Sequence, residues 1–456
     1  MRKTLCRAAT SLTKKFVLLV AAIFMSITVH AYDIAVKNAD GVTIYYNYIN
    51  NGTELEVTRS SKYNEKYSGT VVIPEEVTDG DETLKVTRIG VGAFDQCTNL
   101  VSVTISNGVT SIGDHAFNNC NKMTLLAIPK SVTSIEGNAF NHCDKITSID
   151  IPHGVTSIED GTFQNCKSLV HVDIPNSVTS IGTYAFSDCI SLESISIPTS
   201  VTSIGHGAFF DCKSLVSLDI PNSVTSLGEY LLKDCTSLSS VSISNSVTSI
   251  EQCTFWGCTS LTSVEIPGSV TIIKGFAFRE CSNLDSVVIP NSVTTIEGGT
   301  FWGCECLTSV TIPSSVTKIG AYAFSGCNSL TSVTIGSGVT SIGNAAFKDC
   351  ENLMTVISLI EEPFGIQGKS SLSATFSEYV FMDATLYVPA GTSEKYKATD
   401  GWMDFDHIVE GLPEGILSTS MRETSPSALY DLSGRRLEQK PQKGIYIQDG
   451  RVLIQR

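Results

Sequence analysis

The chain has 456 residues, and its 46 acidic against 31 basic side chains give a net charge of −15. Nucleic acids and anionic lipid surfaces are bound mainly through lysine and arginine, so this composition argues against either as a partner. Apart from residues 16–29, no apolar run approaches the length that crosses a bilayer, so we expect no membrane insertion of the mature chain.

Residues 1–31 have the features of a secretory signal peptide. A basic start is followed by the apolar stretch Phe16–Val29 and then by the small-x-small sequence Val29-His30-Ala31. The apolar stretch is shorter than the roughly 20 residues of a membrane-spanning helix, which disfavours a retained anchor. Removing this segment leaves 26 basic against 46 acidic residues. We therefore expect an exported protein with a mature start near Tyr32.

Twelve cysteines recur along the middle of the chain with an unbroken spacing of 23 residues. They are Cys97, Cys120, Cys143, Cys166, Cys189, Cys212, Cys235, Cys258, Cys281, Cys304, Cys327 and Cys350, and we call them the cysteine ladder. A fixed period of this size is typical of a solenoid, in which each repeat buries its apolar face only against its neighbours. Function should therefore lie on a surface and not in a cleft.

Each repeat contains two different spacings of hydrophobic residues. In the repeat of Cys189, Leu192, Ile195 and Ile197 end in the period-two alternation of a short strand, and Pro198 stops further pairing. Ile181, Ala185 and Phe186 have the spacing of one or two helical turns. The sequence therefore predicts an α/β solenoid of about twelve 23-residue repeats, with short parallel strands on one face and short helical turns on the other. Neighbouring strands should lie about 4.8 Å apart.

Phenylalanine repeats three residues before the cysteine, and leucine replaces it once. The residues are Phe94, Phe117, Phe140, Phe163, Phe186, Phe209, Leu232, Phe255, Phe278, Phe301, Phe324 and Phe347. Such a replacement is what a packing position tolerates, so we interpret the cysteines beside it as buried structural thiols. Disulfides between neighbouring coils remain an alternative in an exported protein. Zinc is disfavoured because a linear ladder offers no tetrahedral ligand set. Cys253 and Cys306 lie off the ladder, and we expect them to be partly exposed.

Aromatic residues recur on the helical side in alternate repeats. Five residues before the cysteine stand Tyr184, Tyr230, Phe276 and Tyr322, and two residues before it stand Phe210, Trp256 and Trp302. Because positions three apart share a helix face, these seven should form one aromatic stripe, our candidate binding surface. The alternative is that the rings pack on one another across neighbouring coils. The strand face offers a second exposed strip, mostly of serines, which solubility and strand propensity explain.

Catalysis finds little support in the sequence. Beyond His30, the histidines fall at unrelated repeat positions, and they are His115, His142, His153, His171, His206 and His407. No glycine-rich phosphate loop or His-x-x-x-His metal pair occurs. We expect no enzyme, no cofactor, no catalytic residue and no metal site.

The repeat pattern C-x-x-L-x-x-V-x-I-P-x-S-V-T-x-I-G-x-x-A-F closely resembles the BspA-like leucine-rich repeats of bacterial surface and secreted proteins, from about Val86 to Met354. Residues 67–74 (YSGTVVIP) and 384–391 (ATLYVPAG) with 402–408 (WMDFDHI) resemble the caps of that family. With the signal peptide at 1–31, the resemblance places an N-terminal cap at 32–85, the solenoid at 86–358 and a C-terminal cap at 359–410, and the composition of 411–427 indicates a linker.

The tail at 428–456, with Tyr430–Arg435 (YDLSGR) and Lys443–Tyr446 (KGIY), resembles the C-terminal sorting domains read by type IX secretion in Gram-negative bacteria. A small β-hairpin addition is the alternative. Together the resemblances imply a protein on the outer surface of such a bacterium or outside it, which binds a protein or glycan in an adhesin-like role. A non-catalytic structural or assembly component of the cell envelope is the alternative function.

Overall fold

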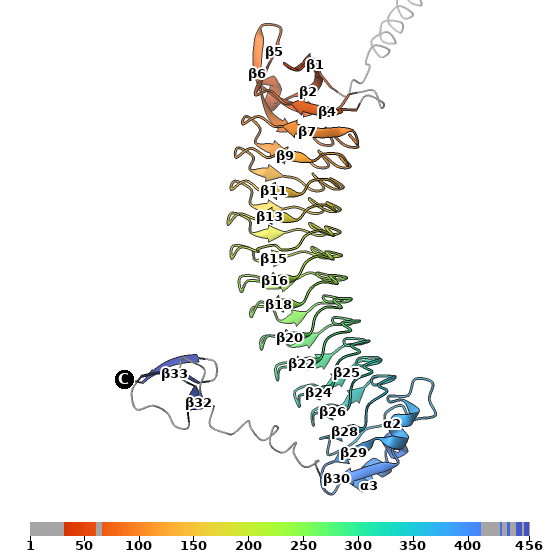
Figure 1. The fold of residues 1–456 in the computed structure, drawn as a ribbon. Coiled ribbons are helices and arrows are strands. Elements are labelled where there is room, and N and C mark those ends of the chain that lie inside the picture. The colour runs from red at the N-terminus through yellow and green to blue at the C-terminus, as the bar shows by residue number, and fades with distance from the viewer. Residues whose placement is uncertain are drawn as a thin grey trace, which may run out of the picture.

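The computed structural model describes residues 32–60 and 66–411, together with the backbone of four short strands nearer the C-terminus. The expected signal peptide and almost all of the expected linker lie outside the described residues. Residues 66–411 form a long stack of coils that bends in its C-terminal half (Figure 1).

The stack begins on a small antiparallel sheet. β1 (Ile34–Lys37) pairs with β2 (Thr43–Ile49), and β2 pairs with β3 (Glu54–Thr58) after the short 3₁₀ turn η1 (Asn50–Gly52). β5 (Glu76–Asp79) and β6 (Glu82–Ile89) form a hairpin, and β6 also runs parallel to β3. Strand β6 therefore joins the antiparallel start of the chain to the parallel stack that follows.

Two rows of short parallel strands run along the coils. The first row contains β4 (Gly69–Val72), β7 (Leu100–Thr104), β9 (Leu125–Ala127), β11 (Ser148–Asp150), β13 (His171–Asp173), β16 (Ser217–Asp219), β18 (Ser240–Ser242), β20 (Ser263–Glu265), β22 (Ser286–Val288), β24 (Ser309–Ile312), β26 (Ser332–Ile335) and β28 (Thr355–Ser358). The second row follows β6 with β8 (Ser111–Ile112), β10 (Ser134–Ile135), β12 (Ser157–Ile158), β14 (Ser180–Ile181), β15 (Ser203–Ile204), β17 (Ser226–Leu227), β19 (Ser249–Ile250), β21 (Ile272–Ile273), β23 (Thr295–Ile296), β25 (Lys318–Ile319) and β27 (Ser341–Ile342).

The pairing register keeps equivalent residues of successive repeats side by side. Ile181 of β14, for example, lies opposite Ile204 of β15, which lies opposite Leu227 of β17. The predicted parallel-strand solenoid with a 23-residue spacing is confirmed.

The expected helical turns are replaced by a ladder of tight turns. In the coil of Cys189, the backbone N–H groups of Tyr184, Phe186 and Asp188 each donate to a carbonyl of the next coil over 2.8 Å. Tyr184 and Asp188 have positive φ values of 52° and 59°, which no α-helix contains. Hydrogen bonds between coils therefore take the place of hydrogen bonds within a helix, although the apolar spacing is the same.

The phenylalanine positions form a buried row along the solenoid, in which rings of neighbouring coils stack. Phe186 is fully buried, and its ring centroid lies 5.4 Å from that of Phe163 and 5.6 Å from that of Phe209. Leu232 fills its place in the stack and is also fully buried. The predicted packing role of this position is confirmed.

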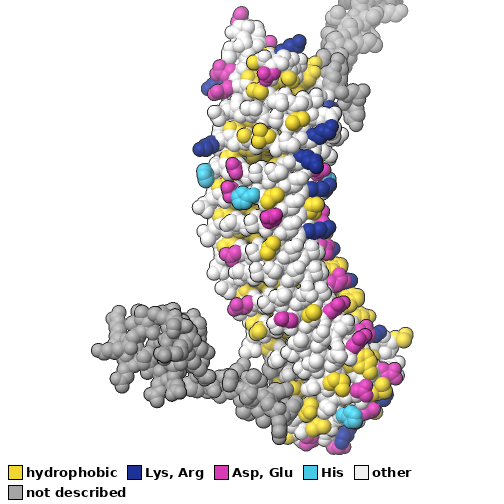
Figure 2. Space-filling view, viewed as in Figure 1, with side chains coloured by type: hydrophobic (Ala, Val, Ile, Leu, Met, Phe, Trp, Pro, Cys, Tyr) yellow, Lys and Arg dark blue, Asp and Glu magenta, His cyan; other side chains and the backbone are white. Residues whose placement is uncertain are grey.

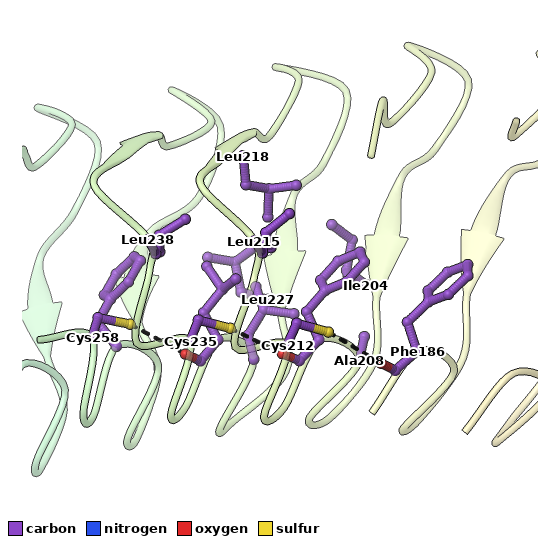
Figure 3. Close-up of a cluster of buried hydrophobic side chains, with 14 of the residues drawn as sticks. Phe186, Ile204, Ala208, Cys212, Leu215, Leu218, Leu227, Cys235, Leu238 and Cys258 are labelled. Carbon is purple, nitrogen blue, oxygen red and sulfur yellow. Dashed lines mark hydrogen bonds between the residues drawn. The ribbon is translucent and has the colours of Figure 1, made fainter. Parts of the chain in front are cut away.

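The cysteine ladder lies beside this stack as buried free thiols. Cys212 Sγ donates to the Phe186 carbonyl oxygen at 3.2 Å, and the same bond recurs from coil to coil (Figure 3). Burial raises the pKa of the Cys166 thiol to about 12, so the thiolate is strongly disfavoured. Off the ladder, Cys306 is exposed as expected, but the expectation for Cys253 is wrong. Cys253 is buried, and its side chain is hydrogen-bonded to Tyr230 of the preceding coil.

The first strand row continues into the C-terminal region. β29 (Thr385–Val388) pairs in parallel with β28, and β30 (His407–Glu410) pairs with β29. Three short helical segments connect these strands: α2 (Glu378–Asp383), α3 (Ser393–Lys397) and the 3₁₀ turn η2 (Trp402–Asp404). Phe376, Trp402 and Phe405 close the end of the core, with ring centroids 5.4 to 6.2 Å apart. None of the helices in the described residues has the length and hydropathy needed to cross a bilayer.

Part of the tail forms a separate antiparallel sheet. Its strands are β31 (Leu429–Tyr430), β32 (Arg436–Leu437), β33 (Gly444–Gln448) and β34 (Arg451–Gln455), in the order β32-β31-β33-β34.

Candidate functional site

Four residues of the aromatic stripe occupy the same left-handed turn position, five residues before the cysteine. Tyr184, Tyr230, Phe276 and Tyr322 have φ values of 52° to 59°. A left-handed backbone is unusual for large side chains, so the surrounding coils must hold it. The rings reach across the equivalent position of the next coil, where the Tyr184 ring occupies the space that a Cβ of Gly207 would need. The aromatic residues and small residues therefore alternate because each ring covers the following coil.

This packing predicts a position-specific cost of adding one methyl group. Gly299→Ala is expected to lower the free energy of unfolding by about 1–3 kcal/mol more than Gly326→Ala, because its Cβ would overlap the Phe276 ring. Both glycines have positive φ, so the backbone cost of about 1–2 kcal/mol is common to both variants. At Gly326 the nearest atom lies 3.7 Å from the added Cβ. Urea unfolding of the two variants measures the difference, and equal losses would contradict the packing.

The position two residues before the cysteine carries a column in which rings and cations alternate. Its members are Phe210, Lys233, Trp256, Arg279 and Trp302, and we call it the cation–aromatic column. Lys233 Nζ lies 5.2 Å from the Phe210 ring centroid and 4.2 Å from that of Trp256. Arg279 Cζ lies 4.4 Å from Trp256 and 4.3 Å from Trp302. The side chains of Lys233 and Arg279 are only 19% and 23% exposed, so each cation is held between two rings.

Glu280 contacts two residues in the middle of this column. Its carboxylate accepts hydrogen bonds from Trp256 Nε1 at 3.1 Å and from Arg279 Nε at 3.0 Å. Burial alone would raise the pKa of this carboxyl, but the hydrogen bonds from Trp256 and Arg279 outweigh it and lower the pKa. The carboxylate is therefore charged at neutral pH and balances the guanidinium.

Six residues of the aromatic stripe lie in two groups of neighbouring rings, and Phe210 is linked to Trp256 only through Lys233. Trp302 lies 6.4 Å from Phe276 and 5.7 Å from Tyr322, measured between ring centroids. In the earlier coils His206 lies between two rings, 5.2 Å from Tyr184 and 5.0 Å from Tyr230. Tyr184 and Tyr322 are the most exposed members, at 36% and 42%.

The sequence prediction missed His206, Lys233, Arg279 and Glu280. The signal for the two cations was present, because reading every repeat at the minus-two position gives the alternation directly. No comparable signal marks His206 or Glu280, whose contacts depend on the neighbouring coil.

The arrangement limits what the stripe can do chemically. Lys233 and Arg279 both lie over the Trp256 ring, and Trp256 Nε1 is bonded to Glu280. Trp302 contacts Arg279 and stacks on the Tyr322 ring, so both tryptophans are partly buried by this chain and expose only part of their surface to a partner. Figure 2 shows hydrophobic and acidic side chains side by side along one edge of the later coils. Among the described residues, no group of three His, Cys, Asp or Glu side chains could hold a metal ion.

A second surface lies on the first strand row near the C-terminal region. A groove of about 930 Å³ crosses β22, β24 and β26, and its lining includes Ser286, Val288, Ser309, Thr311 and Thr334. Val288 is 74% exposed there. The lining carries no charged side chain, in contrast to the acidic residues Asp150, Asp173, Asp219 and Glu265 on earlier strands of the same row.

Comparison with known proteins gives a match to the family described as the BspA type leucine rich repeat region, over residues 81–193, 179–307 and 294–381. A leucine-rich repeat protein from Bacteroides ovatus has 23% sequence identity and a TM-score of 0.47, covering 83% of this chain and 88% of that one. A leucine rich cell surface protein from Faecalibacterium prausnitzii has 28% identity and a TM-score of 0.36, covering 66% and 94%. The pneumococcal vaccine antigen PcpA has 19% identity and a TM-score of 0.49, covering 84% and 99%. No curated protein matches the chain.

Proposed function

The chain belongs to the BspA-type leucine-rich repeat family, and on this premise we propose that it is an exported, non-catalytic protein that binds a protein or glycan through the aromatic stripe. The observation that carries the proposal is the gathering of Tyr, Trp, Phe and Arg side chains over successive coils of one edge. Aromatic residues and arginine contribute most to binding energy in protein interfaces. Their concentration on one edge of an otherwise hydroxyl-rich solenoid supports a docking surface.

Export is supported by the signal-like sequence at residues 1–31, and the net charge near −20 after its removal opposes binding to nucleic acid. The tail at 428–456 would direct the protein to the outer surface of a Gram-negative bacterium if it acts as a sorting domain. An adhesin-like role fits a solenoid, because stacked repeats present long binding surfaces.

The alternative is a structural or assembly component of the cell envelope. It is favoured by one observation, that the ring faces of Trp256 and Trp302 are already covered by side chains of this chain. A surface of this kind can serve rigidity without any foreign partner.

Binding of the mature protein to immobilised extracellular-matrix proteins, mucins and glycans tests the proposal. The Trp256→Ala/Trp302→Ala variant is expected to lose at least roughly 10-fold in affinity for a partner that docks on the stripe. Leu125→Ala/Val288→Ala is the matched control, because these side chains are 68% and 74% exposed on the strand face. Thermal unfolding of each variant separates lost contacts from lost fold.

Two outcomes would count against the proposal. A partner lost equally in both double variants, or only in the strand-face variant, would move the site to the first strand row and its groove. Absence of binding across the array would favour the envelope role.

A further inference from the structure

The minus-two column changes its chemistry along the solenoid. In the coils from Cys97 to Cys189 it holds Asp95, Asn118, Asn141, Gln164 and Ser187, and from Cys212 to Cys304 it is the cation–aromatic column. Asn118 Nδ2 donates to Asp95 Oδ1 at 2.8 Å, and Asn141 Nδ2 donates to Gln164 Oε1 at 3.3 Å. These amide contacts are single hydrogen bonds between partly exposed groups. The later coils instead share cations that each contact rings on both sides.

From this difference we propose that the cation–aromatic column makes the coils of Cys212 to Cys304 one cooperative block, which opens only after the earlier coils have opened. In a solenoid, stability is roughly the sum of coil stabilities and of the couplings between nearest neighbours. Lys233 couples the coils of Phe210 and Trp256, and Arg279 couples those of Trp256 and Trp302. The column therefore provides cation–ring contacts across four successive boundaries between coils, whereas the earlier coils have the amide hydrogen bonds of Asn118 and Asn141 at this position.

The position of the cation–aromatic column agrees with a role in coupling neighbouring coils. The buried phenylalanine stack is interrupted at Leu232, between Phe209 and Phe255. The same coil carries Lys233, whose ammonium group links Phe210 to Trp256 across this interruption. Glu280 strengthens the next boundary, since it binds Trp256 from one coil and Arg279 from its own.

The thiol and phenylalanine contacts between coils are alike in both halves. The thiol-to-carbonyl bond measures 3.3 Å at Cys166 and 3.2 Å at Cys304, and the Phe stack spacing is 5.6 Å at Phe140 and Phe163 against 5.2 Å at Phe278 and Phe301. The first strand row differs, because the coil of Cys189 has no strand between β13 and β16. Removing the cations of the minus-two column therefore has to separate the contribution of this column from that of strand pairing.

Amide hydrogen exchange of the mature chain, followed by mass spectrometry, tests this inference. Backbone amides in the coils of Cys258, Cys281 and Cys304 are expected to exchange roughly 10-fold or more slowly than those of Cys143, Cys166 and Cys189, which lie at a similar depth from the other end. In Lys233→Met/Arg279→Met the apolar stems remain and the cations are lost, so this difference should disappear. Lys348→Met, at the same column position outside the block, should leave it unchanged.

Each result decides the inference. Equal protection of the two halves in the unmodified chain, or a difference that survives Lys233→Met/Arg279→Met, would overturn it. Arg279→Lys, made in a chain that keeps Lys233, retains a cation between the rings. This variant should therefore keep part of the protection that Lys233→Met/Arg279→Met loses. Hydrogen exchange is measured without a binding partner, so its result tests this inference separately from the proposed function.

Discussion

Replacing Phe186 by alanine is expected to lower the free energy of unfolding by about 3–5 kcal/mol. The side chain is fully buried and lies between the rings of Phe163 and Phe209. Its removal leaves a cavity in the core and ends the ring contacts on both sides, each of which adds about 0.5–1.5 kcal/mol beyond buried area. Because every coil is stabilised only by its neighbours, the loss also weakens the coupling between the two halves of the stack. Urea unfolding followed by far-UV circular dichroism measures the change.

Phe186→Leu provides the matched control, because Leu232 occupies the equivalent position in this same chain. Leu232 is fully buried, and its carbonyl oxygen still accepts the thiol of Cys258 at 3.2 Å. The expected loss for Phe186→Leu is about 1 kcal/mol, since a leucine fills most of the ring's volume. Equal losses for the leucine and alanine variants would mean that the ring contacts, and not the filling of space, determine stability at this position.

The sequence predicted those parts of the fold that depend on the residues of a single repeat. Phe186, Cys189 and Leu192 are buried as their 23-residue recurrence indicated, and the 23-residue spacing also places Ile181 opposite Ile204 in neighbouring parallel strands. The turn that follows Ile181 was wrongly predicted to be helical. Tyr184 and Asp188 adopt left-handed φ because their N–H groups bond to the next coil, and a hydrophobic pattern within one repeat carries no information about that neighbour.

The same limit applies to the candidate site. The stripe was found by selecting aromatic letters, and this selection passed over Lys233 and Arg279, which hold Trp256 and Trp302 in place. Chemical type alone could not show that a cation would be sandwiched between rings and not face solvent. Aligning the repeats and comparing the residues at each position, whatever their chemical class, would have found both cations. Equivalent positions of successive repeats are neighbours in space.

The cysteine ladder predicts a steep loss of stability in alkali. An ordinary cysteine thiol has a pKa near 9.0, whereas burial raises the pKa of Cys97 to about 11 and those of Cys166 and Cys350 to about 12. For these three residues the stabilising contribution is fully present below about pH 9 and is lost as pH rises from 9 toward 11 or 12, because the unfolded chain releases protons that the folded chain retains. Each buried thiol should cost about 1.4 kcal/mol per pH unit in this window.

Urea unfolding in reducing buffer at pH 8.0, 9.5 and 10.5 measures this slope. Burial also raises the pKa of Tyr46 and of Tyr67, but tyrosine ionises in the unfolded chain only near pH 10, so the step from pH 8.0 to 9.5 reports mainly on thiols. Cys166→Ala/Cys189→Ala removes two adjacent thiols and should make the dependence shallower in proportion, while Cys306→Ala removes an exposed thiol and should leave it unchanged. A slope that is the same in all three proteins would show that the ladder thiols do not stay protonated in the folded chain. The Sγ atoms would then be thiolates at these pH values and could not donate to the carbonyl oxygen of the preceding coil.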